Sequence, residues 1–252
     1  MHSFDTSNSK FPWYRQSFGD LYPIVYAHRN SEAADREIRL MSQWIGLTPG
    51  HTVLDACCGD GRHLQSLLQL GCAGYGFDLS SELVIRAQSN SVTQNRVCRA
   101  DIRNIPFAPV FDYVFNLFTS FGYFYDDREN QAALKQMVSC LKPEGTLILD
   151  HMNTGRIRRT LVEKSESRTG QYHIVQHRRF VGNRVQKRIE IQTSEDRTHV
   201  FNEDVRMFSP DEIIQLAGIC GLIDISLHGS FCGSTFDERS ERMILRARRP
   251  CR

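Results

Sequence analysis

The fold is decided by residues 53–63, which read VLDACCGDGRH. Residues 52–56 form a short apolar run with β-branched side chains, and such a run predicts a buried strand. Asp55 lies near the end of this run, and Gly59 and Gly61 follow it. Glycine at these positions lets the backbone turn sharply and approach a ligand closely. The stretch therefore predicts a strand, a ligand-binding turn and then a helix.

Segments typical of helices and strands alternate on both sides of this stretch. We expect helices at residues 30–45, 62–70, 81–88 and 128–141, and further strands at residues 74–78, 96–100, 111–117 and 146–151. Residues 143–145, Pro-Glu-Gly, predict a turn before the last of these strands. Such alternation is typical of right-handed βαβ crossovers, which build a parallel sheet. The first 150 residues therefore predict an α/β fold with an open, doubly wound sheet.

The pattern changes in the second half of the chain. Residues 171–180, 184–192 and 198–207 resemble three consecutive strands with no helices between them, which predicts an inserted antiparallel β meander. Residues 209–212, Ser-Pro-Asp-Glu, then carry an N-cap, a proline at the first helical position and a glutamate three residues after the cap. The helix that begins there is followed by two closing strands, at residues 222–227 and 243–247. We therefore expect one domain over residues 1–252.

The charge of the chain is balanced overall and uneven locally. Lys and Arg number 31 against 29 Asp and Glu, a net charge of +2, which does not favour bulk binding of nucleic acid. Residues 151–200 hold 11 of the basic residues and only 5 acidic ones. Such an excess of basic residues is typical of solvent-exposed faces of strands and helices. It would also suit the positively charged entrance of a binding site for an anionic substrate.

Other features bear on location and metal binding. The apolar stretches are too short to span a membrane, and residues 1–10 lack the apolar core of a secretory signal. The eight cysteines show no C-x-x-C spacing, so we expect reduced thiols and a cytoplasmic protein. His173 and His177 share a strand face, but two ligands without a third make a poor site, and we expect no metal.

Three carboxylates are expected at successive strand ends, and they suggest the kind of ligand. Asp55, Asp78 and Asp101 follow the first three predicted strands, and ligands of open α/β sheets bind beyond these ends. The turn holds only G-x-G, whereas a pyrophosphate would favour G-x-G-x-x-G. A carboxylate 17 residues after Gly61 is placed to accept hydrogen bonds from ribose hydroxyls. The pattern favours a nucleoside that carries amino groups.

At these positions the chain resembles the class I S-adenosylmethionine-dependent methyltransferases. The matching motifs lie at residues 53–61, 76–80, 100–102, 111–120 and 141–150. The resemblance implies a Rossmann-like, seven-stranded sheet whose last strand, residues 243–247, is antiparallel. The aromatic residues of positions 13–29, which end in Tyr26, His28 and Arg29, and the inserted meander resemble a small-molecule branch of this family.

The resemblance also divides the chain and assigns a site. It implies a helical lid over residues 1–46, a cofactor-binding core over residues 47–154 and 208–252, and a meander over residues 155–207 that covers the acceptor. The cofactor is S-adenosylmethionine and the product S-adenosylhomocysteine. The implied cofactor-binding residues are Tyr14, Tyr26, Arg29, Asp55, Ala56, Cys57, Gly59, Gly61, Asp78, Leu79, Asp101, Ile102, Asn116 and Phe118. One residue departs from the family, because Cys57 stands where its first motif has a glycine.

The implied reaction is an in-line displacement that moves a methyl group to an N, O or C atom of a small molecule. A base is needed only if the acceptor arrives protonated. His151 is the first candidate, since it follows the fifth strand and its ordinary pKa suits neutral pH, although a structural role is equally open. Tyr123 and His28 are the alternative catalytic candidates.

Two other functions are weighed against this one. A tRNA or nucleic-acid methyltransferase is supported only by the local positive charge, and balanced overall charge opposes it. A protein that binds the cofactor without methyl transfer is the third reading, since a fold does not establish an activity. The expected partners are a small-molecule substrate, no membrane, and a homodimer if an exposed meander edge pairs across a two-fold axis.

Overall fold

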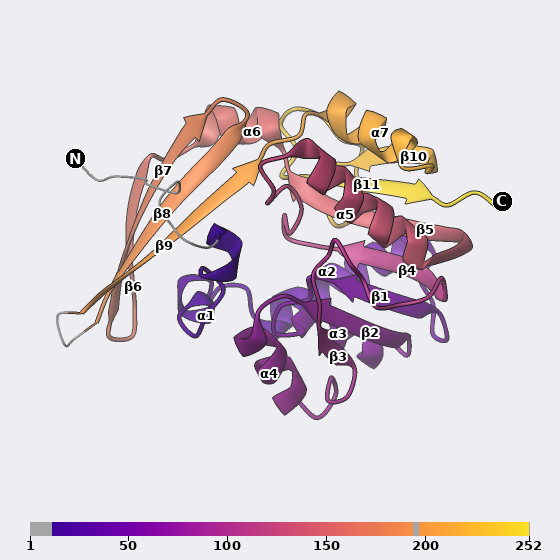
Figure 1. The fold of residues 1–252 in the computed structure, drawn as a ribbon, viewed down its shortest axis with the longest axis horizontal. Coiled ribbons are helices and arrows are strands. Elements are labelled where there is room, and N and C mark those ends of the chain that lie inside the picture. Colours follow the sequence, from indigo (N-terminus) through magenta and orange to yellow (C-terminus); the bar gives the residue numbers. More distant parts are fainter. Residues whose placement is uncertain (1–11, 194–196, 252) are drawn as a thin grey trace.

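The computed structural model of the chain describes residues 12–193 and 197–251; residues 1–11 of the expected lid lie outside them. Its main sheet has seven strands in the order β10-β11-β5-β4-β1-β2-β3 (Figure 1). They are β1 (Thr52–Ala56), β2 (Ala73–Asp78), β3 (Val97–Arg99), β4 (Phe111–Asn116), β5 (Leu141–Met152), β10 (Ile223–His228) and β11 (Arg242–Arg248). β11 runs antiparallel to both its neighbours, whereas the pairs among β1 to β5 are parallel. The predicted fold class is confirmed.

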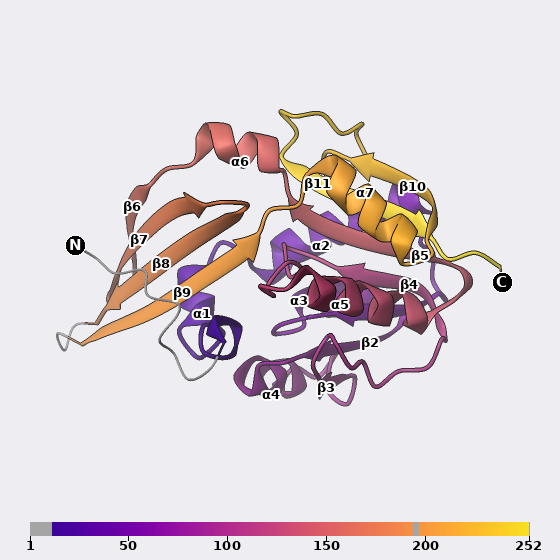
Figure 2. The same ribbon diagram turned by 45° about the horizontal axis from the view of Figure 1, so that its top comes forward.

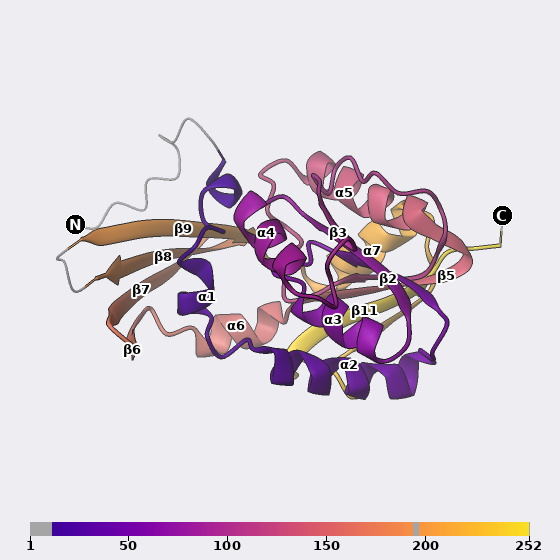
Figure 3. The same ribbon diagram turned by 90° about the horizontal axis from the view of Figure 1, so that it is seen from below.

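Helices cover both faces of this sheet. They are α2 (Ser31–Ile45), α3 (Arg62–Gln69), α4 (Ser81–Ser89), α5 (Asp127–Cys140) and α7 (Pro210–Ile219). Ile38 of α2 and Leu67 of α3 pack against Phe115 and Ile148 on one face, while α5 and α7 pack on the other (Figure 3). α7 begins with the predicted capping box at Ser209. Within the described ranges, no helix is long and apolar enough to cross a membrane.

The inserted meander is a second, separate antiparallel sheet (Figure 2). It has four strands, β6 (Lys164–Thr169), β7 (Tyr172–Val181), β8 (Arg184–Gln192) and β9 (Thr198–Arg206), and α6 (Thr154–Thr160) leads into it. The prediction of three strands was wrong by one. β6 reads KSESRT, and an edge strand with two largely exposed faces shows no apolar alternation by which a sequence could reveal it.

A short N-terminal segment lies between the two sheets (Figure 1). It holds the 3-10 turn η1 (Trp13–Arg15) and the single helical turn α1 (Tyr22–Val25). Leu21, Ile24 and Val25 pack against the buried isoleucines of the meander, which are Ile174, Ile189 and Ile191. The Trp13 ring lies 4.7 Å from the ring of Tyr123, which follows β4. This segment therefore joins the meander to the edge of the main sheet.

The turn predicted at residues 143–145 is not a separate turn, because β5 runs through it. The turn residues instead make an irregularity in the strand. Glu144 has a positive φ of 67°, and the register between β4 and β5 shifts at this point. A local turn signal has become a bulge within a longer strand.

Candidate functional site

The turn after β1 is held by the end of β2. The carboxylate of Asp78 accepts one hydrogen bond from the backbone N–H of Gly59 and another from that of Ser80, each at 2.9 Å. Gly59 and Gly61 have positive φ angles of 58° and 81°, which glycine adopts without strain. A Cβ atom at Gly61 would also lie only 3.2 Å from the Cβ atom of Ala87. Backbone conformation explains both glycines of the motif, and packing is a second reason for Gly61.

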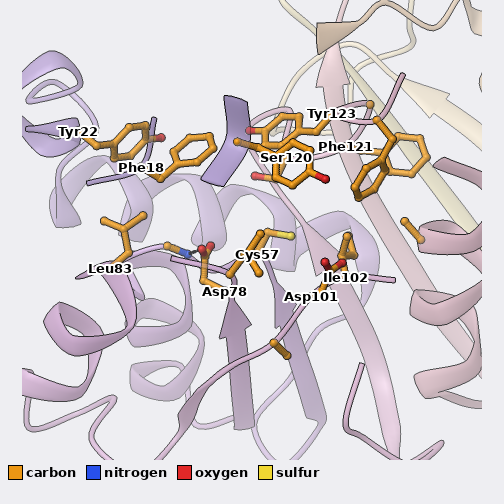
Figure 4. Close-up of a pocket in the computed structure, with 17 residues that line it drawn as sticks. Phe18, Tyr22, Cys57, Asp78, Leu83, Asp101, Ile102, Ser120, Phe121 and Tyr123 are labelled. Carbon is orange, nitrogen blue, oxygen red and sulfur yellow. Dashed lines mark hydrogen bonds between the residues drawn. The ribbon is translucent and has the colours of Figure 1, made fainter. Parts of the chain in front are cut away.

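A first cavity of about 750 Å³ opens beyond this turn (Figure 4). The turn and the strand ends form one side of it, and aromatic residues of the N-terminal segment and of positions 121–124 form the opposite side. Eight of the residues predicted from the sequence line it, which are Tyr14, Cys57, Gly59, Asp78, Leu79, Asp101, Ile102 and Tyr123. The sequence missed its apolar part, namely Phe18, Leu83, Phe121, Phe124 and Ala133.

Two carboxylates of this cavity lie in different electrostatic surroundings. Burial raises the pKa of Asp78, even though the backbone N–H groups that it accepts favour its ionised form. Burial also opposes ionisation of Asp101, but there hydrogen bonds from Arg103 prevail and lower the pKa. Arg103 donates to both oxygens of Asp101, from Nε at 3.0 Å and from a terminal nitrogen at 2.6 Å. Both groups remain acceptors for hydroxyl or amino donors of a ligand.

Asp55 and Asn116 lie behind the turn and line neither of the cavities described here. Asp55 is 2% exposed, and burial raises its pKa to about 7 against the opposing effect of Arg62. Asn116 is fully buried and donates a hydrogen bond of 3.0 Å to the carbonyl oxygen of Ala56. Asp55 Oδ2 and Asn116 Oδ1 are buried acceptors without a hydrogen-bond partner among the described residues. Ala56 and Gly61 likewise line neither cavity.

A second cavity, of about 840 Å³, adjoins the first. The same three aromatic residues, Phe18, Tyr22 and Tyr123, line both, and the rings of Phe18 and Tyr123 stack at 5.8 Å. The remaining walls come from η1, α1, α6 and strands β7 to β9 of the meander. Tyr26, Arg29 and Phe118, predicted as cofactor-binding residues, line this second cavity and not the first. An aromatic wall therefore separates two adjoining pockets.

Polar groups of the second cavity are linked through Tyr26. Its hydroxyl donates to Glu203 at 2.5 Å and accepts from Nζ of Lys187 at 2.6 Å. Burial, and then the charge of Glu203, raise the pKa of this phenol well above its ordinary value. The Arg29 guanidinium lies 4.0 Å from the centre of the Tyr26 ring and donates to the Tyr22 hydroxyl at 3.3 Å.

The three predicted catalytic residues lie in different places. The His151 ring is fully buried, lines neither cavity, and has Nε2 3.1 Å from the carbonyl oxygen of Arg206. Burial, reinforced by the charge of Arg242, lowers its pKa to about 3. His28 is exposed and also lines neither cavity. Of the three predicted catalytic residues, Tyr123 alone lines a cavity, and it lines both.

Metal binding finds no support in the described ranges. No group of three or more His, Cys, Asp or Glu side chains there is arranged to hold an ion. His173 lies near Gln192 and Glu166.

The comparisons agree with this geometry. Residues 53–145 match the family model described as a methyltransferase domain. A solved S-adenosylmethionine-dependent methyltransferase from Clostridium acetobutylicum ATCC 824 superposes with a TM-score of 0.77 at 17% identity, over 91% of this chain and 96% of that one. The chain thus matches a methyltransferase domain over residues 53–145 and has the fold of a solved S-adenosylmethionine-dependent methyltransferase.

Two curated relatives are similar to this chain over different lengths. The glycine/sarcosine/dimethylglycine N-methyltransferase of Actinopolyspora halophila is 33% identical over 108 residues, which are 40% of this chain and only 19% of that protein. The cypemycin N-terminal methyltransferase of a Streptomyces species is 24% identical over 238 residues, 88% of this chain and 97% of that protein. The chain thus spans about a fifth of the first relative and nearly all of the second.

The first cavity fits S-adenosylmethionine, the cofactor named for the solved structure that the chain resembles. The space beside Gly59 is open, because an added Cβ atom there would contact only Leu83 Cδ1, at 3.9 Å. Asp78 and Asp101 supply acceptors at two strand ends. Cys57, the residue that departs from the family motif, lines the cavity and narrows it without closing it.

Proposed function

We propose that this chain is a methyltransferase, which transfers the methyl group of S-adenosylmethionine to a nitrogen atom of a small-molecule acceptor. The observation that carries the proposal is the wall of Phe18, Tyr22 and Tyr123, which lines both cavities. The first cavity would hold the cofactor and the second the acceptor. A cofactor in the first cavity and an acceptor in the second would meet at the junction that these three residues line. Holding two reactants in the right orientation accounts for much of the rate acceleration of a displacement reaction.

Named residues would hold the cofactor in the first cavity. Asp78 would accept from the ribose hydroxyls, and Asp101 with the backbone N–H of Ile102 would bind the adenine edge. Arg29, which lies beyond the aromatic wall, would pair with the carboxylate of the methionine part, because a guanidinium can bind a carboxylate with two hydrogen bonds. When bound, the cofactor supplies a methyl group on a sulfonium ion that leaves as a neutral thioether.

Two observations favour nitrogen as the methyl acceptor. One curated relative is named a glycine/sarcosine/dimethylglycine N-methyltransferase and the other a cypemycin N-terminal methyltransferase. The aromatic rings around the junction of the cavities also favour a cation by their π faces, and an amine gains positive charge as it is methylated. An aromatic wall of this kind suits an amine better than a hydroxyl group.

The second cavity holds a group that can take the proton of an ammonium acceptor. Among the described residues that line it, Glu203 is the only one with a carboxylate, and Tyr26 donates to it. A protonated acceptor would pass its proton toward Glu203 before attack, while Tyr123 would position the nitrogen. His151 would be a structural residue, because its buried ring reaches neither cavity. The N-terminal segment and the meander would exclude water as the walls of the acceptor site.

A product assay tests this function. Purified protein is incubated with S-adenosylmethionine and a panel of small amines, each paired with its hydroxyl analogue, and products are read by the mass gain of one methyl group. We expect methylation of amines alone, loss of turnover in Tyr123→Ala, and no turnover in Asp78→Ala. Products methylated on oxygen, or none although the cofactor binds, would contradict the proposal.

Two narrower proposals concern location and assembly. We propose that the chain acts in the cytoplasm, because all eight cysteines are free thiols, as a reducing compartment would keep them. We also propose a homodimer formed through the edge strand β6, whose backbone offers unpaired hydrogen-bonding groups on one side. Light scattering of the purified protein distinguishes a dimer from a monomer.

A further inference from the structure

A row of charged residues crosses the meander beneath the second cavity. Arg178 of β7 lies directly opposite Lys187 of β8, and Lys187 lies directly opposite Glu203 of β9. All three residues line the second cavity. Residues paired in this way on an antiparallel sheet point to the same face. The row therefore places two cations and one carboxylate side by side in the floor of the cavity.

The residues of β8 on either side of this row are apolar and covered. On β8, Val185 and Ile189 precede and follow Lys187 on the same face, and Ile189 is 3% exposed beneath the N-terminal segment. The Lys187 side chain itself is only 14% exposed. Burial lowers the pKa of both Lys187 and Arg178. Two cations directly opposite each other on a covered face destabilise a sheet unless an anion lies between them.

The charges within the row do not balance. Lys187 lies 3.8 Å from Glu203 and donates to the neutral hydroxyl of Tyr26. Among the described residues, the Arg178 guanidinium donates to neutral groups, which are Ser165 Oγ of β6, Gln176 Oε1 of its own strand β7 and the carbonyl oxygen of Val162. With Arg29 set aside for the cofactor carboxylate, the lining residues still hold one more cation than carboxylate.

We propose that the acceptor carries an anionic group, a carboxylate or a phosphate, that binds at Arg178 and Lys187; this inference rests on the proposed function. One part of the cavity is apolar, where Met152, Ile157 and Leu161 line it. The acceptor is therefore an acidic amine with an apolar body. Its anion lies on the meander and its nitrogen points to the aromatic wall. The excess of basic residues between positions 151 and 200 contributes two of its members to this anion site.

Titration of the S-adenosylhomocysteine-saturated protein tests the inference. The probes are benzoate, phenylphosphonate and benzamide, which share an apolar ring and differ in charge. We expect benzoate or phenylphosphonate to bind at least about ten-fold more tightly than neutral benzamide. The two anionic probes distinguish a carboxylate site from a phosphate site. Saturation with S-adenosylhomocysteine keeps the probes out of the first cavity.

Three variants test which residues cause the preference for an anionic probe. Lys187→Gln and Arg178→Gln should each remove most of the preference for the anionic probe. Arg178→Gln leaves the contacts among Tyr26, Lys187 and Glu203 intact, so it is informative even if Lys187→Gln unfolds. Lys164→Gln is the matched control, because it removes a cation of the same sheet that is exposed and paired with Glu166 outside the cavity. This control should keep the preference.

The outcomes separate this inference from the proposed function. If S-adenosylhomocysteine binds but benzoate and phenylphosphonate bind no better than benzamide, the anion site is overturned and the proposed function stands. Retention of the full preference in Arg178→Gln also overturns it. If S-adenosylhomocysteine does not bind to the wild-type protein, the proposed function fails, and the anion site fails with it.

Discussion

Asp78, at the end of β2, accepts a hydrogen bond of 2.9 Å from the backbone N–H of Gly59, in the turn after β1. One carboxylate therefore fixes the turn and also faces the cavity beyond it. Its second backbone bond, from Ser80, fixes the start of α4 in the same way. The geometry of the proposed cofactor site depends on this link between two neighbouring strands.

The space beside Gly59 gives the first prediction. Gly59→Ala places a methyl group where only Leu83 lies within 4 Å, so the fold should lose only about 1–2 kcal/mol from the positive φ. Affinity for S-adenosylhomocysteine should fall at least about ten-fold, because the methyl group occupies ligand space. Gly50→Ala is the control, since Gly50 has a φ of 91°, open surroundings and no place in either cavity. Calorimetry and thermal unfolding measure both effects; equal cofactor affinities in the two variants would contradict the assignment.

Cys57 is a non-glycine residue in a left-handed conformation, with a φ of 62°. Cys57→Gly should relieve about 1 kcal/mol of backbone strain, which offsets the greater freedom of glycine in the unfolded chain. The variant should also widen the first cavity, so its affinity for S-adenosylmethionine should stay equal or rise. Thermal unfolding and calorimetry test this, and a large loss of affinity would show that the thiol itself contributes to binding.

Asp55 predicts a dependence of stability on pH. Its pKa is about 7 in the folded chain against an ordinary value of 3.8, so the folded state binds this proton more tightly than the unfolded state. The Asp55 contribution to the free energy of unfolding is therefore fully present below about 3.8 and is lost as the pH rises through about 7. Asp55→Asn removes this loss. The free energy of unfolding of the variant, relative to that of the wild type, should therefore be higher at pH 8 than at pH 5. Urea unfolding of both proteins at both pH values tests this prediction. The same difference in unfolding free energy between variant and wild type at pH 5 and pH 8 would contradict it.

His151 predicts the opposite pH dependence. Its folded pKa of about 3 lies below the ordinary 6.5, so its contribution to stability is present above 6.5 and is lost as the pH falls toward 3. His151→Ala should lower the free energy of unfolding by about 2–4 kcal/mol, because it leaves a cavity and removes a buried polar contact.

His151→Gln separates a structural residue from a base. A glutamine amide can still donate to the Arg206 carbonyl oxygen but cannot accept a proton at neutral pH. We expect this variant to keep most of its turnover and the pH profile of the wild type. A folded variant with normal cofactor affinity and no turnover would instead show that His151 acts in catalysis.

The sequence predicted the core of the fold and one side of the site. The first-motif turn, Asp78, Asp101 and the antiparallel last strand follow strong local patterns, because buried strands and glycine turns restrict residue type. α6 was missed, since residues 154–160 read TGRIRRT and bury no side chain fully. Tyr26 and Arg29, predicted as cofactor-binding residues, line the second cavity and not the first, and their role stays a prediction.

The second cavity shows why the rest could not be predicted. Strand alternation places Arg178 and Arg179 on opposite faces of β7, but it does not tell which face is covered by the N-terminal segment. That choice depends on the packing of Leu21, Ile24 and Val25 on the meander, a contact between segments about 150 residues apart. Long-range packing of this kind has no local signature in one sequence.

The most direct test of the central claim is calorimetric titration of the wild-type protein, Asp78→Ala and Asp112→Ala with S-adenosylhomocysteine. Asp112 is a suitable control because it also accepts a backbone N–H, from Thr52, at the opposite end of the sheet. We predict micromolar binding to the wild type and the control, and binding at least about 100-fold weaker in Asp78→Ala, since two hydrogen bonds to a charged group are lost. No binding to the wild type, or equal binding by all three proteins, would contradict the proposed cofactor site.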